Sequence, residues 1–386
     1  MAELTPHDMI GRLVGIPTVS RDSNLDLIDF VANYLDGYGV EAHLVRSDDG
    51  GKANLYATIG PEEPGGIVLS GHTDVVPIDG QGWSSDPFAP EVRDGRIFGR
   101  GTCDMKGFCA LALSLVPEMQ RLRSPIHFAF SYDEEVGCVG APRMIRAIRA
   151  NVPEPRAVIV GEPTSMQIVT GHKGILHFRS HVRGYEAHSS QQHRGVPAIM
   201  YAARLVSWMA EKQAALAAGG DLDERFEPAF TTLHCGVIHG GTAHNITSKD
   251  CHFEADIRSV PGVSARDFFD ELERYAREVL EPMMHAIQPN TGIDFDVTSD
   301  VPSFAVDEDE PAVAMLRQLT GRNDSGVVPF AAECGQFQEE GFSVVMCGPG
   351  SIDQAHQPDE FISLEQVDAG LTFLRSVIGQ QQEPPR

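Results

Sequence analysis

The first part of the chain alternates short apolar runs with segments of helical periodicity. The apolar runs have the length and flanking turn residues of buried strands, and they cover residues 54–59, 67–70, 126–131 and 157–160. Apolar positions recur with the spacing of a helix over residues 22–38, 107–119 and 142–150. Strands and helices in alternation predict an α/β fold with a mostly parallel sheet and helices on both of its faces.

The pattern changes near residue 177. Residues 175–182 alternate apolar and polar positions, as expected of a half-buried strand. Further strands are predicted at 231–238, 251–259 and 292–298, and helices at 197–217 and 264–281. Two helices on one antiparallel sheet predict an inserted α+β domain of the ferredoxin-like type over residues 177–299. Residues 1–176 and 300–386 then form the first domain, with a disordered tail from residue 380.

Composition narrows the classes of function. The chain has 386 residues, enough for two domains that each bury a core. Its 55 acidic residues exceed its 30 basic ones, and the net charge of −25 argues against nucleic acids and anionic membranes as partners. The sequence shows neither a bilayer-spanning apolar run nor a secretory signal, so we expect a cytoplasmic location. Seven cysteines without a CxxC pair predict buried, reduced thiols.

Histidines and carboxylates gather just after the predicted strands of the first domain. The candidates for a metal site are His72, Asp74, Asp104, Glu134, Glu135, Glu162 and His356. Taken singly, a His-x-Asp sequence is a weak signal, an acidic triplet is usually a solvated loop, and an isolated histidine is usually a surface residue. Most of the candidates follow a strand, however, and the carboxyl ends of parallel strands meet at one edge of a sheet. This mixed set suits two Zn²⁺ ions that share a carboxylate, and Co²⁺ or Mn²⁺ can substitute.

The motifs around these candidates resemble the signatures of the dinuclear zinc amidohydrolases and aminoacylases of the M20 peptidase family. They are GHTDVVP (71–77), GW and DPF (82–88), GTCDMKG (101–107), DEE (133–135), GEPT (161–164) and GPGSIDQAHQPDEF (348–361). The similarity extends from about residue 17 to residue 364, and the last motif is the most specific. The chain departs from the family at Cys103, where Ala or Ser is usual. We expect no functional consequence beyond sensitivity to oxidation.

The resemblance implies a role for each ligand. One metal ion is expected on His72 and Glu162, and a second on Glu135 and His356. Asp104 is expected to bridge the two ions.

The resemblance also implies roles for residues that do not bind metal. Asp74 is expected to hydrogen-bond His72 and fix its tautomer. Glu134 is expected to be the general base, which takes a proton from the attacking water and returns it to the leaving amine. The peptide bond between Asp104 and Met105 is expected to be cis.

The predicted insert carries its own candidates. The segment GYEAHSS resembles the family stretch whose histidine, here His188, reaches the active site of a partner subunit and stabilises the oxyanion. The resemblance therefore implies a homodimer formed through the insert. Without it, a histidine near a strand end is more often structural.

A second segment of the insert, GVIHGGTAHNI, resembles a substrate-contacting loop. Asn245 in this segment and Arg258 nearby are expected to bind the α-carboxylate of the substrate, because a guanidinium offers the fork that a carboxylate accepts. The alternative for Arg258 is an ordinary ion pair with Asp256 or Glu254.

Two further residues bear on the choice of substrate. Glu333 lies in a loop that differs from the Ser/Gly/Thr-rich loop of relatives that remove a succinyl group, and we expect it to pair with the side-chain ammonium of ornithine. The alternative is a solvated loop carboxylate. Gly350 is expected to let the backbone approach the substrate closely.

The resemblance thus implies metal-dependent hydrolysis of a small N-acyl amino acid. We expect N-acetyl-L-ornithine to be split into L-ornithine and acetate, in the setting of arginine biosynthesis. Alternatives within the family are another N-acyl amino acid, such as succinyl-diaminopimelate or acetylcitrulline, or a carboxypeptidase substrate. A non-catalytic metal-binding or receptor domain is disfavoured, because such a domain has no use for a base at Glu134.

Overall fold

The chain folds into two compact units. The computed structural model describes residues 4–383. The first unit comprises the chain up to Gly171, residues 305–327 and the chain from Ala332 onwards, and the second comprises His172–Phe304 and Val328–Ala331. Each unit buries its own cluster of apolar side chains. The predicted insert, residues 177–299, falls within the second unit.

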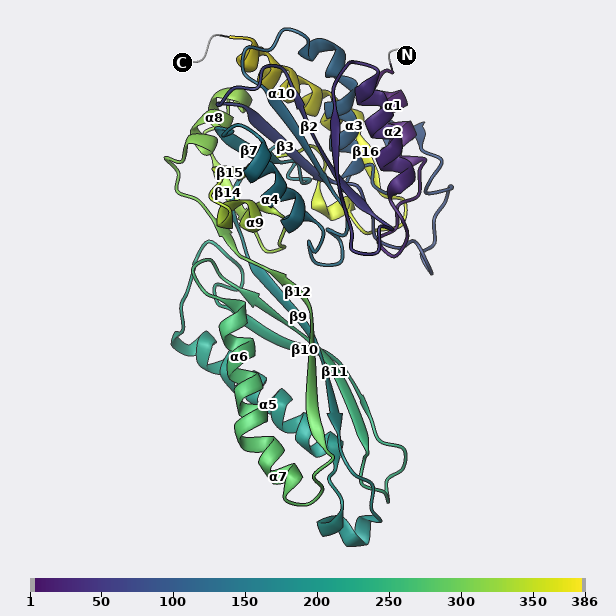
Figure 1. The fold of residues 1–386 in the computed structure, drawn as a ribbon, viewed down its shortest axis with the longest axis vertical. Helices are drawn as coiled ribbons and strands as arrows, with labels where there is room; N and C mark the ends of the chain where they lie inside the picture. The colour runs from purple at the N-terminus through teal and green to yellow at the C-terminus, as the bar shows by residue number, and fades with distance from the viewer. Residues whose placement is uncertain (1–3, 384–386) are drawn as a thin grey trace. The chain divides into compact units, whose positions relative to one another are not determined.

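A nine-stranded sheet forms the centre of the first unit (Figure 1). Its main path runs in the order β1 (Ala42–Arg46), β2 (Ala53–Ile59), β6 (Ile126–Ser131), β3 (Ile67–His72), β7 (Ala157–Val160), β15 (Val344–Met346), β8 (Ile168–His172) and β13 (Phe304–Ala305), and β14 (Ser325–Val328) pairs with β8. The central strands β6, β3, β7 and β15 are parallel, whereas β1, β2 and β8 pair antiparallel with their neighbours. The predicted mostly parallel sheet is therefore confirmed at its centre, and antiparallel strands flank it.

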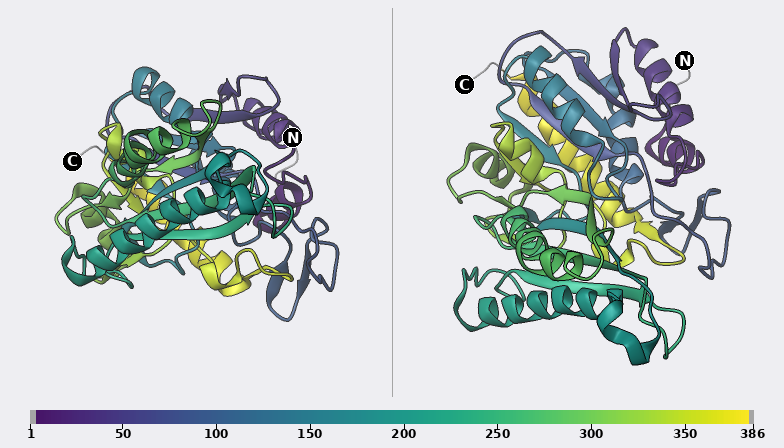
Figure 2. Two further views of the ribbon diagram at one scale, coloured as in Figure 1. Left: turned by 90° about the horizontal axis from the view of Figure 1, so that it is seen from below. Right: turned by 60° about the horizontal axis from the view of Figure 1, so that its bottom comes forward.

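Helices cover both faces of this sheet, as predicted. One core joins the strands to α1 (Pro6–Val14), α2 (Leu25–Asp36), α3 (Lys106–Ser114), α8 (Pro311–Thr320) and α10 (Leu364–Gln382). The right-hand view of Figure 2 shows α10, in yellow, running diagonally across the unit. On the other face, α4 (Ala141–Asn151) contacts β1, β2 and β6, and α9 (Cys334–Glu339) contacts β15. Their apolar side chains lie outside the first core, and the central strands β3, β6, β7 and β15 are buried along their whole length.

A small three-stranded sheet connects two segments that are distant in the sequence. It consists of β4 (Glu91–Arg93), β5 (Arg96–Phe98) and β16 (Phe361–Ser363), with β5 in the middle. Since β5 precedes Asp104 and β16 follows His356, this pairing brings the two candidate ligands into the same region of the first unit.

The structure corrects the sequence analysis at both ends of the chain. The apolar pattern does not predict α1, although Thr5 and Asp8 form a capping box at its start. The expected disorder from residue 380 is wrong for residues 380–382, which form the last turn of α10. There the buried side chain of Gln381 donates a hydrogen bond of 2.9 Å to the carbonyl oxygen of Pro125. Residues 384–386 lie outside the described residues.

The second unit confirms the predicted α+β insert. Its elements follow in the order β9 (Gly174–Arg183), α5 (Ala198–Gly219), β10 (Thr232–Gly240), β11 (Asp250–Ser259), α6 (Ala265–Tyr275) and β12 (Gly292–Val301). The strands form an antiparallel sheet in the order β10-β11-β9-β12, which is the ferredoxin-like arrangement. A π-helical turn carries α6 on into α7 (Glu281–His285), and Figure 1 shows these helices along one side of the four strands.

Two further findings concern the chain as a whole. None of the helices between residues 4 and 383 combines the length and the hydropathy that a bilayer span requires. The seven cysteines all lie within the described residues, and none forms a disulfide. Six are buried as predicted, whereas Cys235 is only partly buried, so the prediction is wrong for that residue.

The pH dependence of stability provides a test of the packing of the sheet. His127 on β6 is 1% exposed, and burial lowers its pKa to about 4. In the unfolded chain its pKa is about 6.5, so between these values the unfolded state takes up a proton that the folded state refuses. The stabilising contribution is complete above pH 6.5 and is lost as the pH falls towards 4. Lowering the pH from 7.5 to 5 should cost about 2 kcal/mol of unfolding free energy through this residue.

Urea unfolding of the wild type and of His127→Gln at the two pH values measures this effect. A Trp208→Phe background leaves Trp83 as the remaining tryptophan, which reports on the first unit. We expect the wild type to lose about 2 kcal/mol more than the variant. Parallel losses in the two proteins would show that His127 does not titrate in this way.

Candidate metal centre

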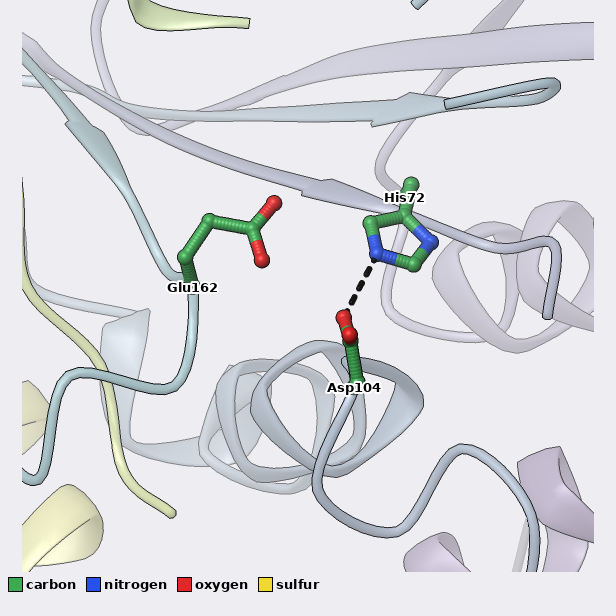
Figure 3. A group of neighbouring side chains, drawn as sticks. All are labelled: His72, Asp104 and Glu162. Carbon is green, nitrogen blue, oxygen red and sulfur yellow. Dashed lines mark hydrogen bonds and ion pairs between the residues drawn. The ribbon is translucent and has the colours of Figure 1, made fainter. Parts of the chain in front are cut away.

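Three buried side chains form a first group of candidate metal ligands, namely His72, Asp104 and Glu162. Their potential ligand atoms all lie within 4.8 Å of one another. Figure 3 shows how they converge: His72 ends β3, Glu162 follows β7, and Asp104 lies in the loop before α3. The parallel strands β3 and β7 thus bring two of the three ligands to the same edge of the sheet.

Asp104 also belongs to a second group, with Glu135 and His356. Nε2 of His356 lies 2.9 Å from a carboxylate oxygen of Glu135 and 3.4 Å from Oδ2 of Asp104. Glu135 lies in the loop after β6, and His356 follows a short 3₁₀ turn at Ile352–Gln354. Within residues 4–383, these two groups are the ones whose geometry suits a metal ion.

The two carboxylate oxygens of Asp104 face different histidines. Oδ1 lies 3.0 Å from Nε2 of His72, whereas Oδ2 is the oxygen near His356. A carboxylate that offers one oxygen to each of two ligand groups has the geometry of a bridging ligand. The arrangement therefore suits two metal ions held side by side.

A tight turn presents Asp104 to both groups. A Cβ atom at Gly107 would lie 2.1 Å from the carbonyl oxygen of Thr102, so that position accepts no side chain. Gly101, at the start of the turn, has a φ of +87°. The Asp104–Met105 peptide bond is cis, as the family resemblance implied.

Asp74 contacts both sides of the centre. Nδ1 of His72 lies 2.9 Å from the backbone carbonyl oxygen of Asp74, whereas the Asp74 carboxylate is 3.7 Å away. The hydrogen bond that fixes the His72 tautomer is therefore made by the backbone of Asp74 and not by its side chain. The carboxylate instead accepts the backbone N–H groups of Glu134 at 3.1 Å and Glu135 at 3.3 Å, together with the Ser20 hydroxyl at 2.7 Å.

Burial and mutual repulsion determine the charges of the cluster. Burial raises the pKa of Glu162 well above its usual value, and the charges of Asp104 and Glu134 raise it further. Burial also raises the pKa of Glu134 to about 8. Hydrogen bonds to Asp104 and Glu135 raise the pKa of His356 to about 10. Carboxylates this crowded do not ionise together unless positive charge lies among them.

The residues fit a pair of divalent cations. Oε1 of Glu135 is buried and has no hydrogen-bond partner among the described residues, which a metal ion would supply. Nδ1 of His72 is engaged with the backbone, so Nε2 is the nitrogen that faces the centre. Histidines and carboxylates are also the ligand types of catalytic zinc sites.

Glu134 lies beside the ligands but belongs to neither group. Its backbone is held by Asp74, and one carboxylate oxygen accepts a hydrogen bond of 3.2 Å from the thiol of Cys138. Nothing in the sequence distinguishes Cys138 from a core thiol, so this contact is not predictable from the sequence. The position of Glu134 suits a group that accepts a proton next to the metals.

Glu333 is buried at the start of α9, with 1% of its surface exposed. Its carboxylate accepts hydrogen bonds from the hydroxyls of Ser131 and Ser70, the latter at 3.2 Å. The solvated-loop alternative is therefore wrong. The carboxylate also does not reach a surface in this conformation, so its predicted pairing with the ornithine ammonium gains no support from the structure.

Gly350 occupies a turn in the first unit. It has a φ of +90°, and its N–H donates a hydrogen bond of 3.0 Å to the side chain of Gln366. Its carbonyl oxygen accepts the backbone N–H of Ser165 at 2.6 Å. These bonds give Gly350 a role in shaping the loop before His356, while its predicted contact with the substrate stays a prediction.

The other predicted site residues, His188, Asn245 and Arg258, lie in the second unit. His188 and Asn245 are neighbours, because the backbone N–H of Ser189 donates to the carbonyl oxygen of Asn245 at 2.9 Å. Both are exposed. Arg258 forms an ion pair of 2.7 Å with Asp256, which is the ordinary pairing that the sequence left open.

The model of peptidase family M20/M25/M40 matches residues 68–380 of the chain. The chain belongs to peptidase family M20. It is accordingly a metallohydrolase, and the two ligand groups around Asp104 correspond to a dinuclear M20 centre.

Similar M20 proteins cover nearly the whole chain. An acetylornithine deacetylase from Yersinia pseudotuberculosis is 35% identical over 388 residues, which cover 95% of this chain and 94% of the relative. An acetylornithine deacetylase from Photorhabdus laumondii is 34% identical over 371 residues, and one from Myxococcus xanthus is 33% identical over 366 residues. Each of these two alignments covers 92% of both chains.

Solved structures of low sequence identity share the fold. A dipeptidase from Saccharomyces cerevisiae has a TM-score of 0.74 at 15% identity, covering 99% of this chain and 96% of the other. An M20 metallo-carboxypeptidase from Sulfolobus solfataricus has a TM-score of 0.74 at 18% identity, covering 98% and 99% of the two chains. These similarities establish the M20 fold and say nothing of the substrate.

The two ligand groups predict how many zinc ions each single variant should bind. Glu162→Ala should leave the group of Asp104, Glu135 and His356 intact, and Glu135→Ala should leave the other, so each variant should bind one zinc ion in place of two. Asp104→Ala should weaken both sites, because Asp104 belongs to both groups. Zinc per chain is measured by elemental analysis after equilibrium dialysis.

Asp353→Ala is a suitable control, since Asp353 is an exposed carboxylate three residues before His356 and belongs to neither group. It should retain two zinc ions. Loss of both ions in Glu162→Ala and in Glu135→Ala alike would contradict the assignment of two separate groups.

Proposed function

We propose that the chain hydrolyses the amide bond of N-acetyl-L-ornithine, releasing acetate and L-ornithine, a reaction of arginine biosynthesis. The observation that carries the reaction type is the Asp104 carboxylate shared by two ligand groups, with the unliganded carboxylate of Glu134 beside them. The choice of substrate is supported by the acetylornithine deacetylases that resemble the chain over more than nine-tenths of its length.

Different residues of the chain bind the metal ions, transfer the proton and position the base. Two Zn²⁺ ions, when bound, polarise the amide carbonyl and make water a better nucleophile. The ions would be held by five residues, namely His72, Asp104, Glu135, Glu162 and His356. Glu134 takes a proton from the attacking water and passes it to the amine nitrogen as the amide bond breaks. Asp74 keeps Glu134 in place by accepting its backbone N–H.

Two residues of the second unit are proposed to recognise the α-carboxylate of the substrate. Arg258 and Asn245 bind the α-carboxylate, and the guanidinium is available for this because Arg258 is only partly buried, with 34% of its side chain exposed. Its ion pair with Asp256 would orient the guanidinium before the substrate arrives. Glu333 has no part in this proposal, since it is buried and already hydrogen-bonded.

We propose a homodimer formed through the second unit. β10 is an edge strand of the four-stranded sheet, so one side of its backbone has no neighbouring strand among the described residues. Apolar side chains are exposed on β10, on the first turn of α5 and in the loop after β10, namely Ile199 (39%), Met200 (59%), Val237 (43%), Ile238 (46%) and Ile246 (41%). Exposed apolar side chains of this number around the open edge of a sheet suit an interface with a second copy.

In this dimer His188 would act in the partner's active site. The backbone N–H of Ser190 donates to Nδ1 of His188 at 3.2 Å, so Nδ1 is the acceptor and Nε2 carries the proton in the neutral ring. An exposed Nε2–H group is what a developing oxyanion requires as a hydrogen-bond donor.

A comparison of substrates tests the proposed reaction. The zinc-loaded protein should hydrolyse N-acetyl-L-ornithine with a kcat/KM at least about a hundredfold above that for N-succinyl-diaminopimelate, roughly 2.7 kcal/mol in the transition state. Ornithine release is measured by an amine assay, and a metal-stripped sample should be inactive. Preference for acetylcitrulline, another N-acyl amino acid or a peptide would reject the proposed substrate while keeping the reaction type.

Glu134→Gln is the variant that tests the reaction type. It should bind two zinc ions as the wild type does and lose a factor of about 10² to 10⁴ in kcat, because the amide cannot accept the proton. Wild-type turnover in this variant would refute the assignment of Glu134 as the base.

Mixing inactive variants tests the dimer and the role of His188. If His188 acts in the partner's site, Glu134→Gln and His188→Ala subunits should form hybrid dimers with one complete site each. Random exchange should then restore about a quarter of wild-type activity, since half of the dimers are hybrids and half of their sites are complete. Activity is followed after the subunits have exchanged under mild dissociating conditions.

The matched control is a mixture of Glu134→Gln with Glu162→Ala, whose defects both lie in the same subunit's centre. This mixture should stay inactive. If both mixtures regained the same activity, or if neither regained any, action of His188 across the interface would be contradicted.

A further inference from the structure

The carboxylate of Glu360 holds the backbone that presents Asp104. Glu360 is 1% exposed, and its Oε1 accepts three backbone N–H groups of one turn. The donors are Gly101 at 3.0 Å, Cys103 at 2.9 Å and Asp104 itself at 3.1 Å. A carboxylate bound by three converging amides fixes the turn firmly, because each bond is assisted by its charge.

Arg100 connects Glu360 to Gln81. Its Nη1 donates to Oε2 of Glu360 at 2.6 Å, and its Nη2 donates to Oε1 of Gln81 at 2.6 Å. The same oxygen of Gln81 accepts the indole N–H of Trp83 at 3.0 Å. Both members of the Arg100–Glu360 pair are buried, so neither charge is free to move away from the other without a large cost.

Gln81 completes the connection to the second histidine. Its Nε2 donates to the backbone carbonyl oxygen of His356 at 2.9 Å. His356 has a φ of +63°, and half of its side chain is exposed, so neighbouring side chains restrain it less than they restrain the other ligands. By contrast, His72 ends a central strand and is 1% exposed.

We propose that Gln81, Arg100 and Glu360 are positioning residues that fix the separation of Asp104 and His356, and thereby set the affinity of the second metal site. The inference rests on the proposed function in requiring that a metal ion binds between these two ligands. The chain of contacts runs from the Asp104 backbone through Glu360, Arg100 and Gln81 to the His356 backbone. None of these three residues is placed to bind metal itself.

Loss of the Gln81 side chain should weaken the second metal site only. A metal ion binds tightly when its ligands are already at the correct separation. Loss of a residue that hydrogen-bonds a ligand typically lowers the metal affinity by a factor of about 10 to 100. Gln81 contacts the backbone of His356, which belongs to the second group alone. His72 and Glu162 are held by β3 and by the chain just after β7, so the first site should keep its affinity without Gln81.

Gln81→Glu is the sharpest test, because Gln81 is only partly buried and the change preserves its size. Glutamate keeps an oxygen for Arg100 and Trp83, but it cannot donate to the His356 carbonyl oxygen. Zinc binding to the metal-stripped variant is measured by calorimetric titration against a competing chelator, with no substrate present. We expect the second zinc ion to bind about 10 to 100 times more weakly, with the first unchanged.

Ser84→Ala is the matched control in the same loop. Ser84 also joins this loop to the segment after His356, since its hydroxyl lies 2.9 Å from Oδ1 of Asp359, but it contacts neither Gln81 nor a ligand. It should bind both zinc ions as the wild type does. Gln81→Met, which loses the donor and the acceptor together, should reproduce the weakened second site if Gln81→Glu does not fold.

Two results would overturn the inference. One is wild-type affinity at both sites in Gln81→Glu. The other is an equal loss at both sites, or an equal loss in Ser84→Ala, either of which would show a general loosening of the fold. Because the titration contains no substrate, its result is independent of which amide the chain hydrolyses.

Discussion

Repulsion among buried carboxylates governs the candidate metal centre and the loops that form it. Asp104 lies within ligand distance of Glu162 in one group and of Glu135 in the other, and Glu134 adds a fourth carboxylate beside them. Burial and neighbouring negative charge raise the pKa values of Glu134 and Glu162, so the cluster is unfavourable as a set of bare anions. Two divalent cations would remove that cost. The repulsion among these carboxylates would therefore favour the binding of metal ions.

The fold meets this constraint by combining rigid and tethered ligands. Central parallel strands deliver His72 and Glu162 to one edge of the sheet, where packing on both faces fixes them. Asp104 and His356 come from loops, and loops need their own restraints. These are the buried carboxylate of Glu360, the side chain of Gln81 and the pairing of β5 with β16. Asp74 provides a similar restraint for Glu134 and Glu135 through their backbone N–H groups.

The sequence was informative where chemistry follows local pattern. Strands with flanking turn residues were recognisable, and the residues just after them, such as His72 and Glu162, were identified as candidate ligands without knowledge of their contacts. The family motifs then separated the ligands from Asp74 and Glu134. The ferredoxin-like insert was predictable because its strands alternate and its helices are long.

The contacts that could not be predicted from the sequence join residues far apart along the chain. Glu360 sits in a motif that was recognised, yet only the folded chain shows its carboxylate bound to the turn at Asp104. Glu333 was expected on a loop surface or against a substrate, and burial against Ser70 and Ser131 decides its environment instead. Asp74 was assigned to His72 through its side chain, but the backbone makes that bond because the carboxylate turns towards the Glu134 and Glu135 amides.

Anomalous diffraction at the zinc edge from crystals of the zinc-loaded protein would give the number and the positions of the bound ions. We expect two peaks, one next to each carboxylate oxygen of Asp104, with His72 and Glu162 at one peak and Glu135 and His356 at the other. A single peak, or two peaks that do not share Asp104, would contradict this expectation.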